Sequence, residues 1–234
     1  MVVPNLCFNG LPGCIYTDAT CLAALLLLYE QDRRLVEESC KSLFTILELF
    51  NYDGFNEIIH GRLFHHHHNP TLAGIMAHIG LKTIVILPDP ATVFSNLSRP
   101  RPSRKASTVA SCLKYFKEWL ELVPMRETNP HLIVLQAADI ANNPIPIASA
   151  LTRLELIHSS HSQSSLDHLY RFAKCMTPDM MELCYGEDFQ LEPEFDNSAP
   201  REQQDRIRAL TEQHPIANEI KELHREVTGS LFTK

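Results

Sequence analysis

Two short apolar runs constrain the fold of this chain more than any other feature. They are Thr83–Leu87, within KTIVILPDP, and Leu132–Ala137, within HLIVLQAAD. Neither run alternates between apolar and polar residues, so each predicts a strand that is covered on both faces. Residues 104–123 lie between them and repeat apolar side chains at helical spacing. We therefore expect a strand, a right-handed crossover helix and a parallel strand.

The expected fold class is helix-rich α/β, with a small, mostly parallel sheet flanked by helices and a C-terminal helical extension. The alternative is an all-α fold in which both runs are short buried helices. We expect a globular domain over residues 1–185, an acidic linker over 186–200 and a charged helical tail over 201–234. The linker contains five acidic residues and no basic one, which is typical of a solvated segment.

Turn and capping residues place the remaining elements. Val2–Phe8 predicts a strand that ends in a turn at Asn9–Gly10. The run CLAALLLLY is apolar on nearly all sides, so its helix should be buried. We expect helices over residues 18–31, 33–50, 70–79, 104–123, 148–158, 165–176 and 179–185.

Charge and cysteine usage limit the possible surroundings and partners. The formal net charge is −7, which disfavours generic nucleic-acid binding. The seven cysteines are dispersed without a Cys-x-x-Cys pair, as expected for free thiols in a reducing compartment. The longest apolar run, Cys21–Tyr29, is shorter than the roughly 20 residues of a membrane span. We expect a cytoplasmic protein without a membrane span, with a nuclear location as the alternative.

The run of four histidines within FHHHHNPTLAGIMAH is the most unusual local feature. Adjacent histidines cannot all converge on one tetrahedral zinc, although two of them could ligate with help from a nearby histidine. We predict no cofactor and expect a solvated loop before a helix that begins at Asn69–Pro70. Zinc, or a pH-sensitive patch, is the alternative. Its candidate residues are His65, His66, His67, His68 and His78.

A second histidine cluster lies in HSSHSQSSLDH. If this segment were helical, His158 and His161 would share one face and could ligate a metal, with Asp167 and His168 nearby. The serine content instead favours a loop between two helices.

Two aspartates follow the two predicted strands. Asp89 lies just beyond the first strand and Asp139 ends the second segment. Ligands of open α/β sheets bind beyond the carboxyl ends of the strands. These carboxylates could hold a metal–phosphate or act as acid and base. The simpler interpretation is that both are turn residues.

The segment SRPRPSRKAS is basic and rich in proline. It could contact nucleic-acid phosphates or serve as a nuclear-import signal, although an ordinary solvated loop is the simpler interpretation. Its basic residues are Arg99, Arg101, Arg104 and Lys105. Ser107 matches a basophilic kinase target near a helix start, where added negative charge is favourable.

These observations favour a non-catalytic, intracellular interaction protein of the adaptor or regulatory type, with another protein as its partner. The tail carries a narrow apolar stripe that could dock on that partner: Ile216, Ile220, Leu223 and Val227. The first alternative is an α/β enzyme that binds a metal–phosphate or small molecule at Asp89 and Asp139. The second is nucleic-acid contact through the basic loop over residues 99–105.

Overall fold

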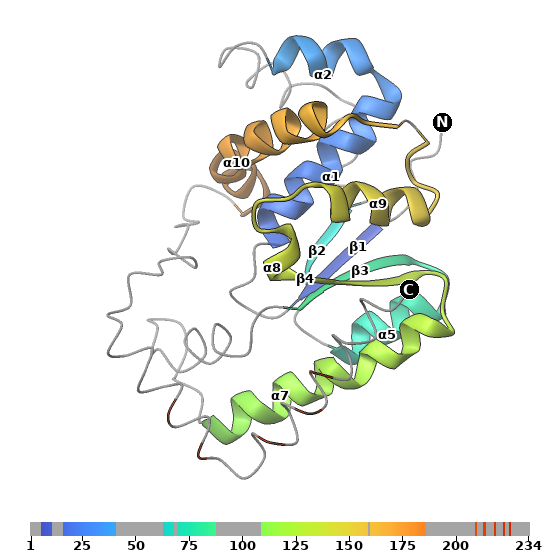
Figure 1. Ribbon diagram of the computed structural model, residues 1–234, viewed down its shortest axis with the longest axis vertical. Helices are drawn as coiled ribbons and strands as arrows, with labels where there is room; N and C mark the ends of the chain where they lie inside the picture. Colours follow the sequence, from blue (N-terminus) through green and yellow to red (C-terminus); the bar gives the residue numbers. More distant parts are fainter. Residues whose placement is uncertain are drawn as a thin grey trace.

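The part of the chain that the structure describes forms one four-stranded parallel sheet with helices on both faces (Figure 1). The computed structural model describes residues 6–10, 16–40, 63–67, 70–87, 109–158 and 160–185, and the single residues 209, 213, 218, 222 and 225. The strands are β1 (Leu6–Gly10), β2 (Leu63–His67), β3 (Lys82–Leu87) and β4 (Leu132–Gln136). Their order is β2-β1-β3-β4, and each neighbouring pair is parallel. The predicted α/β fold is therefore confirmed.

The helices form two layers around this sheet. Their bounds are α1 (Tyr16–Gln31), α2 (Arg33–Ser39), α5 (Pro70–His78), α7 (Val109–Leu122), α8 (Ala137–Ile140), α9 (Ile145–Arg153) and α10 (Gln163–Tyr185), with a 3-10 helix at Val123–Glu127. Helices α1, α9 and α10 lie over one face, and α5 and α7 lie over the other (Figure 1). The connection through α1 leads from β1 to β2, toward one edge of the sheet. The connections through α5 and α7 lead to β3 and β4, toward the other edge. Because it also uses the opposite face, all three crossovers have the same hand, as parallel units require.

Helix α1 is the centre of the larger core. Every residue from Ala19 to Leu28 is buried, because the sheet, α2, α9 and α10 surround the helix. Ile84, Ile86 and Ile133 meet it from the sheet. The expectation of a buried helix is confirmed.

The second face carries a separate core. Strand alternation turns Val85 and Val134 toward α5 and α7, since their neighbours point toward α1. Gly74 lets α5 approach α7 closely, because a Cβ atom there would lie 3.2 Å from Leu122 Cδ2. Trp119 is fully buried on α7, in agreement with a packing role.

Three predictions about turns and helix boundaries are wrong. Asn9 and Gly10 form the end of β1, opposite Val85 and Ile86, and make no turn. Pairing with parallel strands replaces the hairpin that the Asn-Gly pair suggests. The predicted helix over residues 148–158 lies at Ile145–Arg153, because Asn143 Oδ1 accepts a hydrogen bond from Ile145 N at 3.1 Å and Glu155 adopts a positive φ of 55°.

The third wrong prediction concerns the helices expected over residues 165–176 and 179–185. They are one helix, α10, which continues across Pro178. A proline inside a helix costs about 3 kcal/mol and is usually a boundary. Leu166, Leu169 and Met176 pack α10 into the core shared with α1, and this tertiary contact outweighs the local signal.

Of the predicted linker and tail beyond residue 185, the structure describes five exposed residues. Ala209, Asn218, Glu222 and Arg225 are helical, and Gln213 lies in a turn. The apolar stripe at Ile216, Ile220, Leu223 and Val227 lies outside the described residues, so its docking role and the predicted boundaries stay predictions. Within the described segments, no helix has both the length and the apolar character needed to cross a bilayer.

Candidate binding groove between α9 and α10

A groove of about 560 Å³ lies between α9, the segment before α10 and the first turns of α10. We call it the α9–α10 groove. Its volume falls within the range of about 300–1,000 Å³ that is common for ligand sites. It lies on the helical layer that also contains α1, and it uses residues from three consecutive parts of the chain.

Helix α9 supplies one wall. Its lining residues are spaced as one helical face: Ile145, Ala148, Ser149, Thr152 and Arg153. The opposite face of α9 carries Ile147, Ala150 and Leu151, which are buried in the main core. This arrangement leaves Ile145 with 42% of its surface exposed in the groove.

Contacts with the sheet fix the far end of α9. Lys82, the first residue of β3, donates hydrogen bonds to the carbonyls of Leu154 and Glu155. These carbonyls follow the last turn of α9, where a cation is favourable. The Arg153 end of the groove therefore lies near the amino ends of the strands, opposite the edge at which α/β ligands usually bind.

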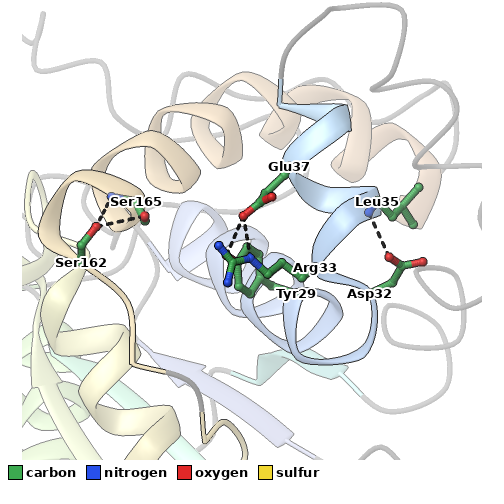
Figure 2. Close-up of polar contacts among 7 residues, drawn as sticks. All are labelled: Tyr29, Asp32, Arg33, Leu35, Glu37, Ser162 and Ser165. Carbon is green, nitrogen blue, oxygen red and sulfur yellow. Dashed lines mark hydrogen bonds and ion pairs between the residues drawn. The ribbon is translucent and has the colours of Figure 1, made fainter.

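The second wall is the connection from α9 to α10. It contributes His158, Ser160 and His161, and the start of α10 contributes Gln163 and Leu166. Ser162 Oγ accepts a hydrogen bond from Ser165 N at 3.2 Å, which caps the helix (Figure 2). The predicted loop between two helices is confirmed for the described residues 158 and 160–162, whereas Gln163–His168 of the same cluster form the start of α10. Asp167, a candidate neighbour of a metal site, accepts a hydrogen bond from Gln163 Nε2 at 2.7 Å.

His161 connects the groove to α1. Its ring lies edge-on to the ring of Tyr29, with the centroids 5.0 Å apart. Burial is the main cause that lowers the pKa of His161; Arg33 also lowers it, and Glu30 opposes the shift. The Nε2 atom is buried and has no hydrogen-bond partner. His161 is therefore predominantly neutral at pH 7 and acts as part of the wall.

A polar cluster behind Tyr29 holds α1 and α2 together (Figure 2). Tyr29 Oη donates to Glu37 Oε1 at 3.0 Å, and Arg33 Nε donates to the same oxygen at 2.7 Å. Asp32 caps α2 by accepting from Leu35 N at 3.0 Å. This cluster positions the Tyr29 ring against which His161 packs.

Among the residues that the structure describes, none that lines the groove is a carboxylate, although the chain has 28 acidic residues. Arg153 and His158 are its charged or chargeable exposed residues. The apolar part is formed by Ile145, Ala148 and Leu166. Such a surface can hold an apolar group and an acidic group of one ligand.

The predicted site at the strand ends is present only in part. Strands β3 and β4 are parallel neighbours, so their carboxyl ends lie at one edge, as expected. Asp139 is exposed on α8, immediately beyond β4. Asp89 lies outside the described residues, so a pairing of the two carboxylates stays a prediction.

The histidine run does not form the expected loop. His65, His66 and His67 belong to β2, which pairs with β1. A run of identical residues has no alternating pattern that would predict a strand. The β2 strand forms through its pairing with β1. His78 is exposed at the end of α5, and His68 lies outside the described residues. Among the described residues no group of three His, Cys, Asp or Glu could hold a metal ion, and zinc binding by the full run stays a prediction.

The basic residues Arg99, Arg101, Arg104 and Lys105 and the phosphorylation candidate Ser107 lie outside the described residues. Their roles stay predictions. Sequence reasoning missed Ile145, Ser149 and Arg153 as site residues. Starting α9 at Asn143–Pro144 would have revealed their shared face, because Asn before a helix start is a common capping signal.

None of the four free cysteines that the structure describes lines the groove. Cys7, Cys21, Cys40 and Cys175 are free thiols. Burial, followed by the charge of Glu37, raises the pKa of Cys40 to about 11. Its thiol is therefore protonated at neutral pH and unsuited to attack.

Comparison with known proteins gives no family assignment. The chain matches no protein-family model, and no curated protein is significantly similar to it.

Proposed function

We propose that this chain is a non-catalytic interaction protein that binds a segment of another protein in the α9–α10 groove. The observation that carries the proposal is the groove itself, with its exposed apolar residue Ile145 beside polar and cationic side chains. Peptide-binding grooves combine apolar anchor sites with a few polar groups that fix orientation.

We place the protein in the cytoplasm, with the nucleus as the alternative location. The free thiols of Cys7, Cys21, Cys40 and Cys175 support a reducing compartment. A regulatory role through the linker, the tail and Ser107 belongs to the same proposal and rests on sequence alone.

The proposal is tested by selecting peptides from a displayed random library on the full-length chain. Ser149→Trp fills the groove from an exposed position on α9. Ser111→Trp is the matched control, because Ser111 is exposed on α7, over the other face of the sheet, and does not line the groove. We expect peptides selected on the wild-type chain to lose binding to the Ser149→Trp variant and to keep it with the control. Equal binding to both variants would overturn the groove as the docking site.

One specific observation favours a second function, a small-molecule site at the carboxyl edge of the sheet. The strand order reverses direction between β1 and β3, and ligands of doubly wound sheets bind at such a reversal. Asp139 lies at this edge of the sheet. The site is tested by the rise in melting temperature that Mg²⁺ with inorganic phosphate produces. A rise that Asp139→Asn or Asp89→Asn abolishes would support the enzyme alternative, and no rise would remove it.

A further inference from the structure

We infer that the α9–α10 groove selects a segment that carries an apolar side chain and, about four residues away, an acidic side chain. This inference rests on the proposed function and names the class of its partner. It is carried by the charge of the lining, the start of α10 and the spacing along α9.

The first argument is the charge distribution. In a chain of net charge −7, no carboxylate is found among the described residues that line the groove, while Arg153 and His158 line it and are exposed. An acidic group bound there gains an ion pair with Arg153 and meets no repulsion from the lining.

The start of α10 adds to this preference. Helix N-termini favour negative charge, and many helices provide it with their own acidic residues. The first turn of α10 has none, and it begins with Gln163, Ser164 and Ser165. Because Gln163 lines the groove, the positive end of this 23-residue helix borders it, next in sequence to the lining residues His158 and Ser160.

The spacing along α9 sets the distance between the two groups. Ile145 and Arg153 are eight residues apart on one helical face, which corresponds to about 12 Å along the axis. An extended segment rises about 3.3 Å per residue, so the two side chains it presents are about four residues apart. Ile145 receives the apolar side chain, and Arg153 receives the acidic one.

The probe is the acetylated, amidated peptide Leu-Ala-Ser-Ala-Glu, titrated into the ¹⁵N-labelled full-length chain and followed by amide chemical shifts. Its control ends in Gln. We expect shifts within residues 145–153 and 158–166, and about fivefold weaker binding of the Gln peptide, as for an exposed ion pair. Arg153→Gln should remove the difference between the peptides, and Lys174→Gln should keep it.

Equal affinity for the two peptides would overturn the acidic preference and leave the proposed groove intact. Absence of chemical shift changes in residues 145–153 and 158–166 with either peptide would also overturn the acidic preference. The library selection would then still decide whether the groove binds a partner segment. The acidic segment over residues 186–200 is a competing occupant. Binding that appears only after its five acids are replaced by amides would identify that segment, and not a partner, as the occupant.

Discussion

Gly80 ends α5 in a conformation that other residues rarely adopt. Its φ is +88°, its amide donates to the carbonyl of Ala77 at 3.1 Å, and Leu81 N donates to that of Met76 at 2.9 Å. This pair of bonds closes the helix and depends on a left-handed residue. The position of Gly80 after a helical pattern made this end predictable from sequence.

Gly80→Ala should lower the free energy of unfolding by about 1 kcal/mol, because a Cβ atom strains a left-handed residue. Space is not the cause, since the nearest atom to that Cβ would be His131 Nε2 at 3.9 Å. Urea unfolding measures the loss. Gly80→Asn should cost less, because Asn tolerates this conformation. A larger loss for Asn than for Ala would contradict the conformational explanation.

His161 should make stability depend on pH. Its pKa in the folded chain is lowered from 6.5, mainly by burial, so the unfolded chain binds more protons. The contribution of the neutral His161 ring to the free energy of unfolding is complete above pH 6.5. It is lost as the pH falls from 6.5 toward the lower pKa of His161 in the folded chain. Tyr29, Glu30 and Arg33 are the titratable or charged groups around this ring.

The expected result is that His161→Asn flattens the decline in unfolding free energy between pH 7 and pH 5. His168→Asn, which removes an exposed histidine of α10, serves as the control. Chemical unfolding at several pH values measures both variants. The explanation is wrong if the two substitutions change the pH profile equally.

At the scale of elements, α8 depends on α10 for its position. Tyr170 Oη donates to the carbonyls of Ile140 and Ala141 at 2.8 and 3.2 Å, and Lys174 Nζ donates to that of Ala141 at 3.1 Å. A four-residue helix has little stability of its own. These contacts join residues about 30 positions apart, so the sequence did not reveal them.

Tyr170→Phe should reduce the free energy of unfolding by about 1–2 kcal/mol, because it removes a buried hydrogen bond and leaves the Ile140 carbonyl with the longer bond, 3.4 Å, from Asn143 N. Tyr29→Phe is the matched control, since its hydroxyl bonds to the exposed Glu37 and its loss should cost about 0.5 kcal/mol. Thermal and urea unfolding measure both. Similar losses for the two variants would show that Tyr170 does not anchor α8.

For the whole molecule, strands β3 and β4 were predictable from the sequence, whereas β2 and the α9–α10 groove were not. Unbroken apolar runs identify β3 and β4, because burial on both faces leaves no polar alternation. The β2 strand is defined by its pairing with β1, which lies far away in the sequence. The groove joins α9 to the residues that follow it, but the position of α9 depends on its packing against α1 and α10, so no local pattern in HSSHSQSSLDH could locate the groove wall.

Lys82 links the sheet to the α9 layer. Lys82→Met keeps most of the side-chain volume and removes the donor to the carbonyls of Leu154 and Glu155. We expect a loss of about 1–2 kcal/mol in unfolding free energy. Lys174→Met should cost less, because the carbonyl of Ala141 is partly exposed and water can replace the ammonium. An equal or greater loss at Lys174 would contradict the cross-layer role.

The central claim is that a partner segment binds in the α9–α10 groove. Hydrogen–deuterium exchange of the full-length chain, with and without a peptide selected from the library, tests it most directly. We predict slower exchange at residues 145–153 and 158–166, with no change at residues 137–141. Protection at residues 137–141 alone would place the ligand at the carboxyl edge of the sheet and contradict the claim.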